Sequence, residues 1–395
     1  MIKIACISQH WVSVFSNPSR ALLGKQFIIV LCCIWGISNN VSASNLLPSE
    51  SYQVTKVATE LNSPWSMVEL PNGTWIVTER DGHVVIIKGS KQTRIKLPLV
   101  NLYVAGQGGL LDVVLAPDFA QSKQVFFTYA QGELEANRLL VVSATFDGQS
   151  FSNLTTVYKV QTDKGTPQHY AGRLLVLPDN SLLLTSGDGF DYREQAQVLT
   201  SQLGKILRFN MNGSIPSDNP FVNHSQDSAK VVFSLGHRNP QGLVYDYDRQ
   251  QIIGHEHGPA GGDELNIINA GKNYGWPVIT FGRDYSRARI SPFIEYKGML
   301  KPNVDWTPSI APSGMAYYGT HQKAFPSLHQ HVLVTTLVDK KVYAINVADG
   351  QFTQSHILPE VSGRLRDVLV TKDGEIAILS DGQQAQLMLV SAVPK

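Results

Sequence analysis

The sequence predicts an all-β protein with the architecture of a β-propeller, and two observations support this fold class. From Tyr52 onward, no long stretch places apolar residues at helical spacing; short runs of β-branched and aromatic residues alternate instead with Gly, Asp, Asn and Pro. A turn-and-strand unit also recurs along the chain. Such units fit a propeller because the sheet of each blade buries its faces against its neighbours. A two-sheet sandwich is the structural alternative.

The recurring unit is a turn pair followed by an apolar strand. Its three copies are Leu70-Pro-Asn-Gly-Thr-Trp-Ile-Val, Leu177-Pro-Asp-Asn-Ser-Leu-Leu-Leu and Thr371-Lys-Asp-Gly-Glu-Ile-Ala-Ile. The second and third copies lead into Gly187-Asp188-Gly189 and Ser380-Asp381-Gly382. The spacing between copies is irregular, so the number of blades does not follow from it.

No linker or change in composition divides residues 44–395, so we expect them to form a single domain. The chain of 395 residues holds 33 basic and 32 acidic residues and is only 16% charged. This balance excludes a nucleic-acid-binding surface built on bulk charge. Because 43% of the residues are hydrophobic, the chain can form a core, which excludes a disordered protein.

Residues 1–43 have the pattern of a secretory signal peptide. They contain three basic residues and no acidic residue, and an apolar run follows from 27 to 37. That run is too short to span a bilayer, which needs about 20 residues, but it suits the hydrophobic region of a signal. Val41-Ser42-Ala43 then supplies small residues for cleavage after Ala43. The alternatives are a short buried helix and a lipoprotein signal, which the bulky Leu31 before Cys32 disfavours.

Cleavage after Ala43 would determine the chemistry of the mature protein. All three cysteines, Cys6, Cys32 and Cys33, lie in the removed segment, so the mature chain would have no disulfide and no cysteine metal site. It would carry 30 basic and 32 acidic residues, a formal net charge of −2. We therefore expect an exported protein without a membrane span, located in the periplasm if the source is a Gram-negative bacterium.

The densest polar cluster is the segment from His255 to Glu264, His-Glu-His-Gly-Pro-Ala-Gly-Gly-Asp-Glu. Its glycines leave the backbone free to turn carbonyl oxygens toward a hard cation, and calcium accepts such ligands. Calcium is therefore the metal expected here. The alternatives are a transition metal held by His255 and His257 around Glu256, and a loop whose glycines only permit a tight turn.

Three further motifs carry candidate functional groups. His169 precedes an expected strand, where a histidine can act as a general base near neutral pH, although a lone histidine is more often a surface residue. Arg238 and Asn239 offer donors in a turn bounded by glycines. Arg364 and Arg366 are two residues apart, so in a strand both point to one face and favour a di- or tricarboxylate ligand. A solvated arginine pair is the alternative.

The residues and the order of these motifs resemble those of the glucose/sorbosone dehydrogenase family, specifically its soluble aldose sugar dehydrogenases, which depend on pyrroloquinoline quinone (PQQ). The resemblance runs from about Leu61 to Leu379. It rests on eight segments, which are residues 63–65, 77–80, 106–112, 168–174, 236–242, 256–277, 312–315 and 363–367.

The resemblance implies a six-bladed propeller with PQQ over its central channel. His169 matches the base that takes the proton from the anomeric hydroxyl while the C1 hydride moves to the quinone. Arg238 and Asn239 match residues that hydrogen-bond the quinone oxygens, where negative charge grows, so Arg238 also has a catalytic role. The remaining assignments are Arg364 and Arg366 to the cofactor carboxylates, His257 to a cofactor contact, Gln107 to the sugar, the carbonyls of Gly258 and Pro259 to calcium, and Glu264 and Tyr274 to a second calcium site.

The chain departs from the family pattern at three places. Ala171 stands where glycine is usual, a change that is tolerated if Ala171 has a negative φ. His257 stands where the glucose dehydrogenase branch has Gln, which places the chain nearer the aldose sugar dehydrogenase branch. The lysine that contacts the cofactor in some members cannot be assigned to Lys340 or Lys341.

The leading hypothesis is an exported oxidoreductase that uses PQQ and calcium to oxidise aldose sugars at the anomeric carbon to lactones. The electron acceptor and the oligomeric state do not follow from the sequence. A calcium-dependent propeller lactonase is the first alternative, but it has no need for two arginines aimed at a carboxylated cofactor. A non-catalytic binding propeller is the second, and it has no need for His169 and Arg238 in addition to that pair.

Overall fold

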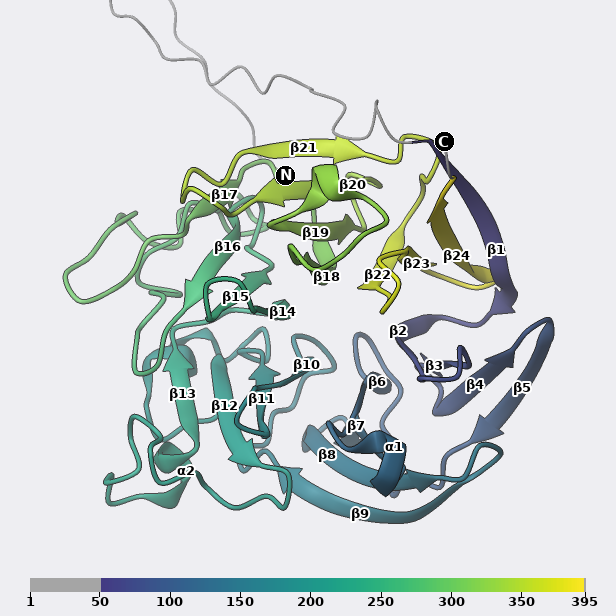
Figure 1. Ribbon diagram of the computed structural model, residues 1–395. Helices are drawn as coiled ribbons and strands as arrows, with labels where there is room; N and C mark the ends of the chain where they lie inside the picture. The colour runs from purple at the N-terminus through teal and green to yellow at the C-terminus, as the bar shows by residue number, and fades with distance from the viewer. Residues whose placement is uncertain (1–50, 394–395) are drawn as a thin grey trace, which may run out of the picture. The chain divides into compact units, whose positions relative to one another are not determined.

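The computed structural model describes residues 51–393, and the predicted signal peptide, residues 1–43, lies outside them. Six four-stranded antiparallel sheets are arranged around a common centre (Figure 1). The predicted propeller is therefore confirmed, with the six blades that the family resemblance implies, and the two-sheet sandwich is wrong.

The first three blades, in chain order and from inner to outer strand, have the following strands. Blade 1 is β2 (Pro64–Glu69), β3 (Trp75–Glu79), β4 (His83–Lys88) and β5 (Lys91–Lys96); blade 2 is β6 (Leu110–Leu115), β7 (Gln124–Gly132), β8 (Asn137–Phe146) and β9 (Phe151–Lys159); blade 3 is β10 (Ala171–Val176), β11 (Ser181–Ser186), β12 (Lys205–Asn210) and β13 (Val232–Leu235).

The other three blades repeat this order, except that the sixth takes its outer strand from the start of the described chain. Blade 4 is β14 (Pro240–Asp246), β15 (Gln251–Glu256), β16 (Asp263–Ile268) and β17 (Val304–Trp306); blade 5 is β18 (Pro312–Tyr318), β19 (His331–Thr336), β20 (Val342–Asn346) and β21 (Gln354–Ile357); blade 6 is β22 (Leu365–Val370), β23 (Ile376–Ser380), β24 (Ala385–Ala392) and β1 (Tyr52–Leu61).

The helices within residues 51–393 are short and lie in loops. They are α1 (Phe119–Ser122), the 3-10 helix η1 (Arg193–Gln197), α2 (Asp227–Lys230) and the 3-10 helix η2 (Pro326–Leu328). None of them has the length and apolar character needed to cross a membrane.

The three copies of the recurring unit form the hairpins between the first and second strands of blades 1, 3 and 6. In the first copy, the Leu70 N–H donates to the Thr74 carbonyl at 2.7 Å and the Gly73 N–H donates to the Leu70 carbonyl at 2.9 Å. Equivalent bonds close the turns after Leu177 and Thr371. The fourth position of each turn, which is Gly73, Asn180 or Gly374, has a positive φ, which explains the Gly or Asn found there.

Apolar side chains fill the interfaces between blades. Between blades 2 and 3, for example, Phe126 and Phe209 belong to one buried cluster, and Tyr158 stacks on Phe209 with a centroid distance of 4.5 Å. Each inner strand also contacts the inner strands of both neighbouring blades, which closes the ring. Because each blade is hydrophobic on both faces, no blade can bury its core residues alone.

A buried charge cluster joins the inner strands at the centre of the ring. Arg173 of β10 forms ion pairs with Asp112 of β6 at 3.1 Å and with Asp367 of β22 at 3.3 Å. Its guanidinium also lies 4.3 Å from the ring of Trp65. These contacts tie blades 1, 2, 3 and 6 together beneath one end of the ring.

Candidate active site

The topology brings the predicted motifs to one end of the ring. In an antiparallel blade, the start of the inner strand and the end of the second strand lie at the same end. Gln107, His169, Asn239 and Arg364 lie in loops that enter inner strands, and the loop of His257 leaves the second strand β15. Residues up to about 260 positions apart in sequence therefore come together at one end of the central channel, which we call the mouth.

His169 is held by a carboxylate that the sequence did not single out. Its Nδ1 lies 2.7 Å from Oδ1 of Asp188, which follows β11. The carboxylate of Asp188 is fully buried and also accepts hydrogen bonds from the Phe190 N–H at 2.8 Å and from Nε1 of Trp276 at 2.7 Å. With Nδ1 donating to this carboxylate, Nε2 is the basic nitrogen of the ring.

The environment keeps His169 neutral near pH 7. The residue is only 4% exposed, and burial lowers the pKa of His169, with the hydrogen bond to Asp188 opposing this effect and the charge of Arg238 adding to it. Within residues 51–393, Nδ1 of His255 is the only side-chain nitrogen or oxygen that is both inaccessible to solvent and without a hydrogen-bond partner. Nε2 of His169 also accepts no hydrogen bond from these residues. Since it is not inaccessible, it must be at least partly exposed to solvent.

The backbone around His169 is in a conformation that L-residues rarely adopt. His169 has φ 47° and Ala171 has φ 57°. The condition under which alanine would be tolerated, a negative φ at Ala171, is not met, because the entry into β10 is bulged between Ala171 and Leu174 and the chain turns there through left-handed residues. Such strain persists where the surroundings fix the geometry, here through the Ala171 N–H, which donates to Oδ1 of Asn239 at 3.1 Å.

Gln107 and Asn239 complete the support of His169. Oε1 of Gln107 accepts a hydrogen bond from the His169 N–H at 2.9 Å and lies 3.5 Å from Nδ2 of Asn239. Asn239 is fully buried, and its Oδ1 accepts a second hydrogen bond from Gln241 at 3.1 Å. The structure thus brings together three residues that come from separate sequence motifs.

Arg238 is directed toward the glycine-rich loop. Its Nη1 donates to the carbonyls of His257 at 3.1 Å and Gly258 at 2.5 Å, and its N–H donates to the Glu256 carboxylate. Glu256 is also 3.0 Å from Nδ1 of His237. The Nε2 atoms of His255 and His257 face backbone carbonyls, at 3.4 Å from Gly314 and 2.7 Å from Pro312, and within residues 51–393 they are not part of a group of three converging metal ligands.

A central cavity of about 330 Å³ opens at the mouth. Arg80, Arg364 and Arg366 line it, together with Gln107, His257 and Ala171. Both Arg364 and Arg366 reach the same carboxylate, that of Asp381, with Nη2 at 2.8 and 2.9 Å from it, although Arg364 precedes β22 and the pairing of β22 is irregular between Leu365 and Asp367. Three guanidinium groups face one carboxylate, which gives the cavity a net positive charge and fits a polycarboxylate such as PQQ.

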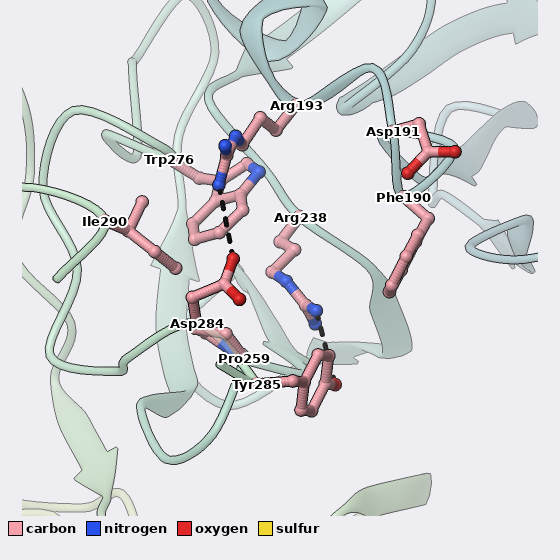
Figure 2. A pocket seen from close by; sticks show the side chains of 9 residues that line it. All are labelled: Phe190, Asp191, Arg193, Arg238, Pro259, Trp276, Asp284, Tyr285 and Ile290. Atoms are coloured by element: carbon pink, nitrogen blue, oxygen red, sulfur yellow. Dashed lines mark hydrogen bonds and ion pairs between the residues drawn. The ribbon is translucent and has the colours of Figure 1, made fainter. Parts of the chain in front are cut away.

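A side cavity of about 170 Å³ adjoins the site, and Figure 2 shows the residues that line it. Arg238 and Trp276 contribute to its wall, and Nη2 of Arg238 lies 3.4 Å from the Tyr285 hydroxyl. Phe190 and Tyr285 stack with a centroid distance of 6.3 Å, and they are 41% and 62% exposed. The edge of Phe190 also meets the ring of His169, with 5.0 Å between their centroids.

The loop after β15 is packed closely around backbone oxygens. A Cβ on Gly258 would lie 2.1 Å from the carbonyl oxygen of Gly262 and 2.3 Å from that of Gly261, so only glycine fits. Asp263 fixes the loop by accepting from the Gly258 N–H at 2.9 Å. The Gly258 carbonyl, which already faces the Arg238 cation, has a second lone pair that suits a hard cation, so the donor set fits calcium at Gly258 and Pro259.

The other predicted site residues occupy different surroundings. Glu264 lies opposite Glu256 across β15 and β16, and burial together with repulsion from Glu256 raises the pKa of Glu264 well above its usual range. The hydroxyl of Tyr274 donates to the Ile267 carbonyl at 2.7 Å instead of pointing to Glu264. Lys340 and Lys341 do not line the central cavity.

Arg80, Asp188 and Asp381 are site residues that the sequence alone did not assign. Arg80 ended a motif used only for the family resemblance, yet it lines the central cavity, and burial followed by the charge of Arg366 lowers the pKa of Arg80. Asp188 and Asp381 were interpreted only as turn residues. Each of these two aspartates follows a copy of the recurring unit at a similar position. This shared position is the sequence signal that could have identified them.

The chain matches the model of the glucose/sorbosone dehydrogenase family over residues 61–389. It is 34% identical to aldose sugar dehydrogenase YliI of Escherichia coli (strain K12) over 376 residues, which are 92% of this chain and 98% of that protein. It is 38% identical to the uncharacterized protein slr1608 of Synechocystis sp. over 347 residues, which are 83% of this chain and 84% of that protein.

Solved structures of related proteins have the same fold. The soluble aldose sugar dehydrogenase of Escherichia coli in its apo form gives a TM-score of 0.81 at 34% identity, covering 87% of this chain and 100% of that one. The PQQ-bound aldose sugar dehydrogenase of Streptomyces coelicolor gives a TM-score of 0.70 at 26% identity, covering 88% and 100%. The chain therefore belongs to the glucose/sorbosone dehydrogenase family.

Proposed function

We propose that this protein oxidises aldose sugars at the anomeric carbon to lactones, with PQQ as the electron acceptor and calcium as a cofactor. The observation that carries the proposal is the position of the His169–Asp188 pair beside a cavity lined by three arginines. Similarity to the PQQ-bound aldose sugar dehydrogenase of Streptomyces coelicolor supports the same cofactor.

His169 acts as the base in this proposal. Its neutral Nε2 takes the proton of the anomeric hydroxyl, and the buried carboxylate of Asp188 stabilises the positive charge that forms on the ring. The three hydrogen bonds that Asp188 accepts fix its carboxylate before the reaction, so little reorganisation accompanies proton transfer.

PQQ supplies a two-electron acceptor for the C1 hydride, and calcium supplies a Lewis acid that polarises the quinone. Arg80, Arg364 and Arg366 would hold the cofactor carboxylates, with His257 at the same cavity. The carbonyls of Gly258 and Pro259 would ligate calcium, and Arg238 and Asn239 would donate to the quinone oxygens. Glu264 and Tyr274 remain candidates for a second calcium site.

The sugar lies between Gln107 and the side cavity in this arrangement. Phe190 and Tyr285 present exposed aromatic faces next to His169, and the C–H faces of a pyranose pack well on such rings. A lactonase would not require a cavity lined by three arginines, so the oxidoreductase is the better supported of the two enzymes.

The experiment is to add PQQ and calcium to purified apoprotein and to follow dye reduction with glucose and other aldoses. We expect reduction that needs both cofactors. His169→Gln should bind PQQ normally but lose at least about 100-fold in kcat, the usual contribution of a general base. Absence of both PQQ binding and dye reduction in the wild-type protein would refute the proposal, whereas normal turnover in His169→Gln would refute the assignment of the base.

We also propose that residues 1–43 direct export and that residues 44–395 form a single catalytic domain. The family match begins at residue 61, downstream of the predicted cleavage site, which supports this division. Sequencing the N-terminus of the protein recovered from the periplasm should give a chain that starts at Ser44. A mature N-terminus at Met1 would contradict it.

A further inference from the structure

Lys164 is a buried lysine that the proposed mechanism does not use. It lies in the segment between β9 and β10 and is only 3% exposed. Its Nζ donates to the Thr166 carbonyl at 2.5 Å and sits 3.4 Å from the centre of the Tyr170 ring. A carbonyl and an aromatic face are the whole set of partners that the described residues provide for this ammonium group.

A buried lysine usually pairs with a carboxylate, because an unpaired charge is costly to remove from water. Among residues 51–393, no carboxylate lies within ion-pair distance of Nζ of Lys164. The nearby Asp163 is paired with Arg138 instead. A buried titratable group that lies beside a reactive group and has no charged partner is a candidate for a functional role.

The reactive group beside Lys164 is His169. Lys164 and His169 are both among the residues that line one small cavity of about 10 Å³. Two further hydrogen bonds fix the segment of Lys164 to the loop of Asp188: Oγ1 of Thr166 donates to the Gly189 carbonyl at 2.6 Å, and the Gly165 N–H donates to the Tyr192 hydroxyl at 3.0 Å. The ammonium is thus held at a fixed place relative to the His169–Asp188 pair.

We propose that Lys164 is a positioning residue for the base: its buried ammonium group opposes protonation of His169 and so keeps this residue able to accept a proton in mildly acidic solution. The proposal rests on the proposed function for its catalytic meaning, although the electrostatic effect itself does not depend on catalysis.

The titration behaviour of both groups is consistent with this role. Burial lowers the pKa of Lys164 to about 7, against the opposing attraction of Asp188. Burial is also the main cause of the lowered pKa of His169, and the charges of Arg238 and Lys164 lower it further. As the pH falls below 7, Lys164 therefore becomes charged, and that charge resists protonation of His169 just when protonation would stop proton abstraction.

Other groups that face Lys164 do not supply the same effect. Asp188 acts in the opposite direction, because its negative charge raises the pKa of both Lys164 and His169. The hydroxyl of Tyr170 stays neutral in the relevant pH range, since burial raises the pKa of Tyr170 above that of an ordinary phenol. Arg138 carries a charge that Asp163 balances.

The test compares Lys164→Met, which removes the charge, with Lys164→Arg, which keeps it. The pKa of His169 is measured by NMR in the apoprotein, with His169→Gln to assign the signal. We expect Lys164→Met to raise this pKa by about one unit, the shift that a unit charge about 10 Å away causes at an effective dielectric constant of about 20. Lys164→Arg should stay close to the wild type. In the holoenzyme, the acid limb of the kcat/KM profile should move to higher pH in Lys164→Met by the same amount.

Lys205→Met is the matched control. Lys205 is also buried with a pKa lowered to about 7, but its Nζ donates to the carbonyls of Gln195, Ala196 and Leu203, and it is not among the groups that shift His169. We expect lower stability and an unchanged His169 titration in this control. A His169 pKa that is unchanged in Lys164→Met, or that rises equally in Lys164→Arg or Lys205→Met, would overturn the inference. A shift in Lys164→Met without any sugar oxidation by the wild type would leave the electrostatic role standing and refute only the proposed function.

Discussion

Asp188→Asn removes one charge from the site with almost no change in shape, and its consequences can be worked out from three hydrogen bonds. Oδ1 of Asp188 accepts from His169 and from the Phe190 N–H, and Oδ2 accepts from Nε1 of Trp276. An asparagine has only one oxygen to offer. With that oxygen facing His169, the amide N–H₂ faces the indole N–H of Trp276, and one buried donor is left without an acceptor, which costs about 1–3 kcal/mol of stability.

The effect on catalysis follows from the lost charge. A hydrogen bond to a charged group contributes about 1.5–3 kcal/mol, and this stabilisation of the protonated His169 ring disappears, so kcat should fall by about 10- to 150-fold. If the amide nitrogen faces His169 instead, the ring must accept at Nδ1 and carry its proton on Nε2, which abolishes the base. Because Asp188 raises the pKa of His169, its loss lowers that pKa, and the acid limb of the rate profile should move to lower pH.

The assay is kcat for aldose oxidation at saturating PQQ and calcium, alongside a PQQ titration and urea unfolding. Asp147→Asn is the matched control, because Asp147 also accepts three hydrogen bonds, from Gln149 and Ser150, but in an exposed turn. A kcat for Asp188→Asn within about threefold of the wild type, with the holoenzyme fully formed, would mean that the carboxylate does not support a base and would refute the reasoning.

Three other predictions concern the cofactor, the metal and the backbone. Arg366→Ala should weaken PQQ binding to the apoprotein by about 10- to 100-fold, and Arg364→Ala should weaken it by less. The reason is that the Arg366 side chain is 14% exposed, whereas that of Arg364 is 50% exposed. A fluorescence titration in which neither variant changes the affinity for PQQ would contradict this. Gly258→Ala should lower calcium affinity by at least about tenfold in calorimetry, since its Cβ would meet two carbonyl oxygens. Gly298→Ala, which has open space but a positive φ, should lower stability without changing calcium affinity; equal affinities in the two variants would argue against the loop as the metal site. Ala171→Gly should raise the free energy of unfolding by about 0.5–1 kcal/mol by relieving a positive φ, and a decrease would show that the packing of the lost methyl group matters more.

The parts of the fold that depend on local chemistry could be predicted from the sequence. The turns after Leu70, Leu177 and Thr371 are specified by Gly or Asn at one position and by hydrogen bonds within five residues, so they form as expected. These features need no information from the rest of the chain.

The parts that depend on long-range contacts could not be predicted in the same way. The partner of His169 is Asp188, which comes from the far side of a β-hairpin and has the sequence context of an ordinary turn. The sign of φ at Ala171 is set by a bulge and by the hydrogen bond to Asn239, about 70 residues away. Arg238 is directed by carbonyls of a loop from another strand. In each case the deciding atoms are distant in sequence, and no local pattern encodes them.

The pairing of β1 with β24 sets the order in which the molecule can be completed. Residues Tyr52–Leu61 leave the ribosome before any other described strand, yet their hydrogen-bond partners at Ala385–Ala392 leave last. Until β24 is present, β1 and β23 each keep an unpaired edge of the kind that attracts other chains. A nascent or truncated chain that lacks the last few residues would therefore be the species most prone to aggregate, and a chaperone that covers β1 during synthesis would protect an edge that the protein cannot yet cover itself.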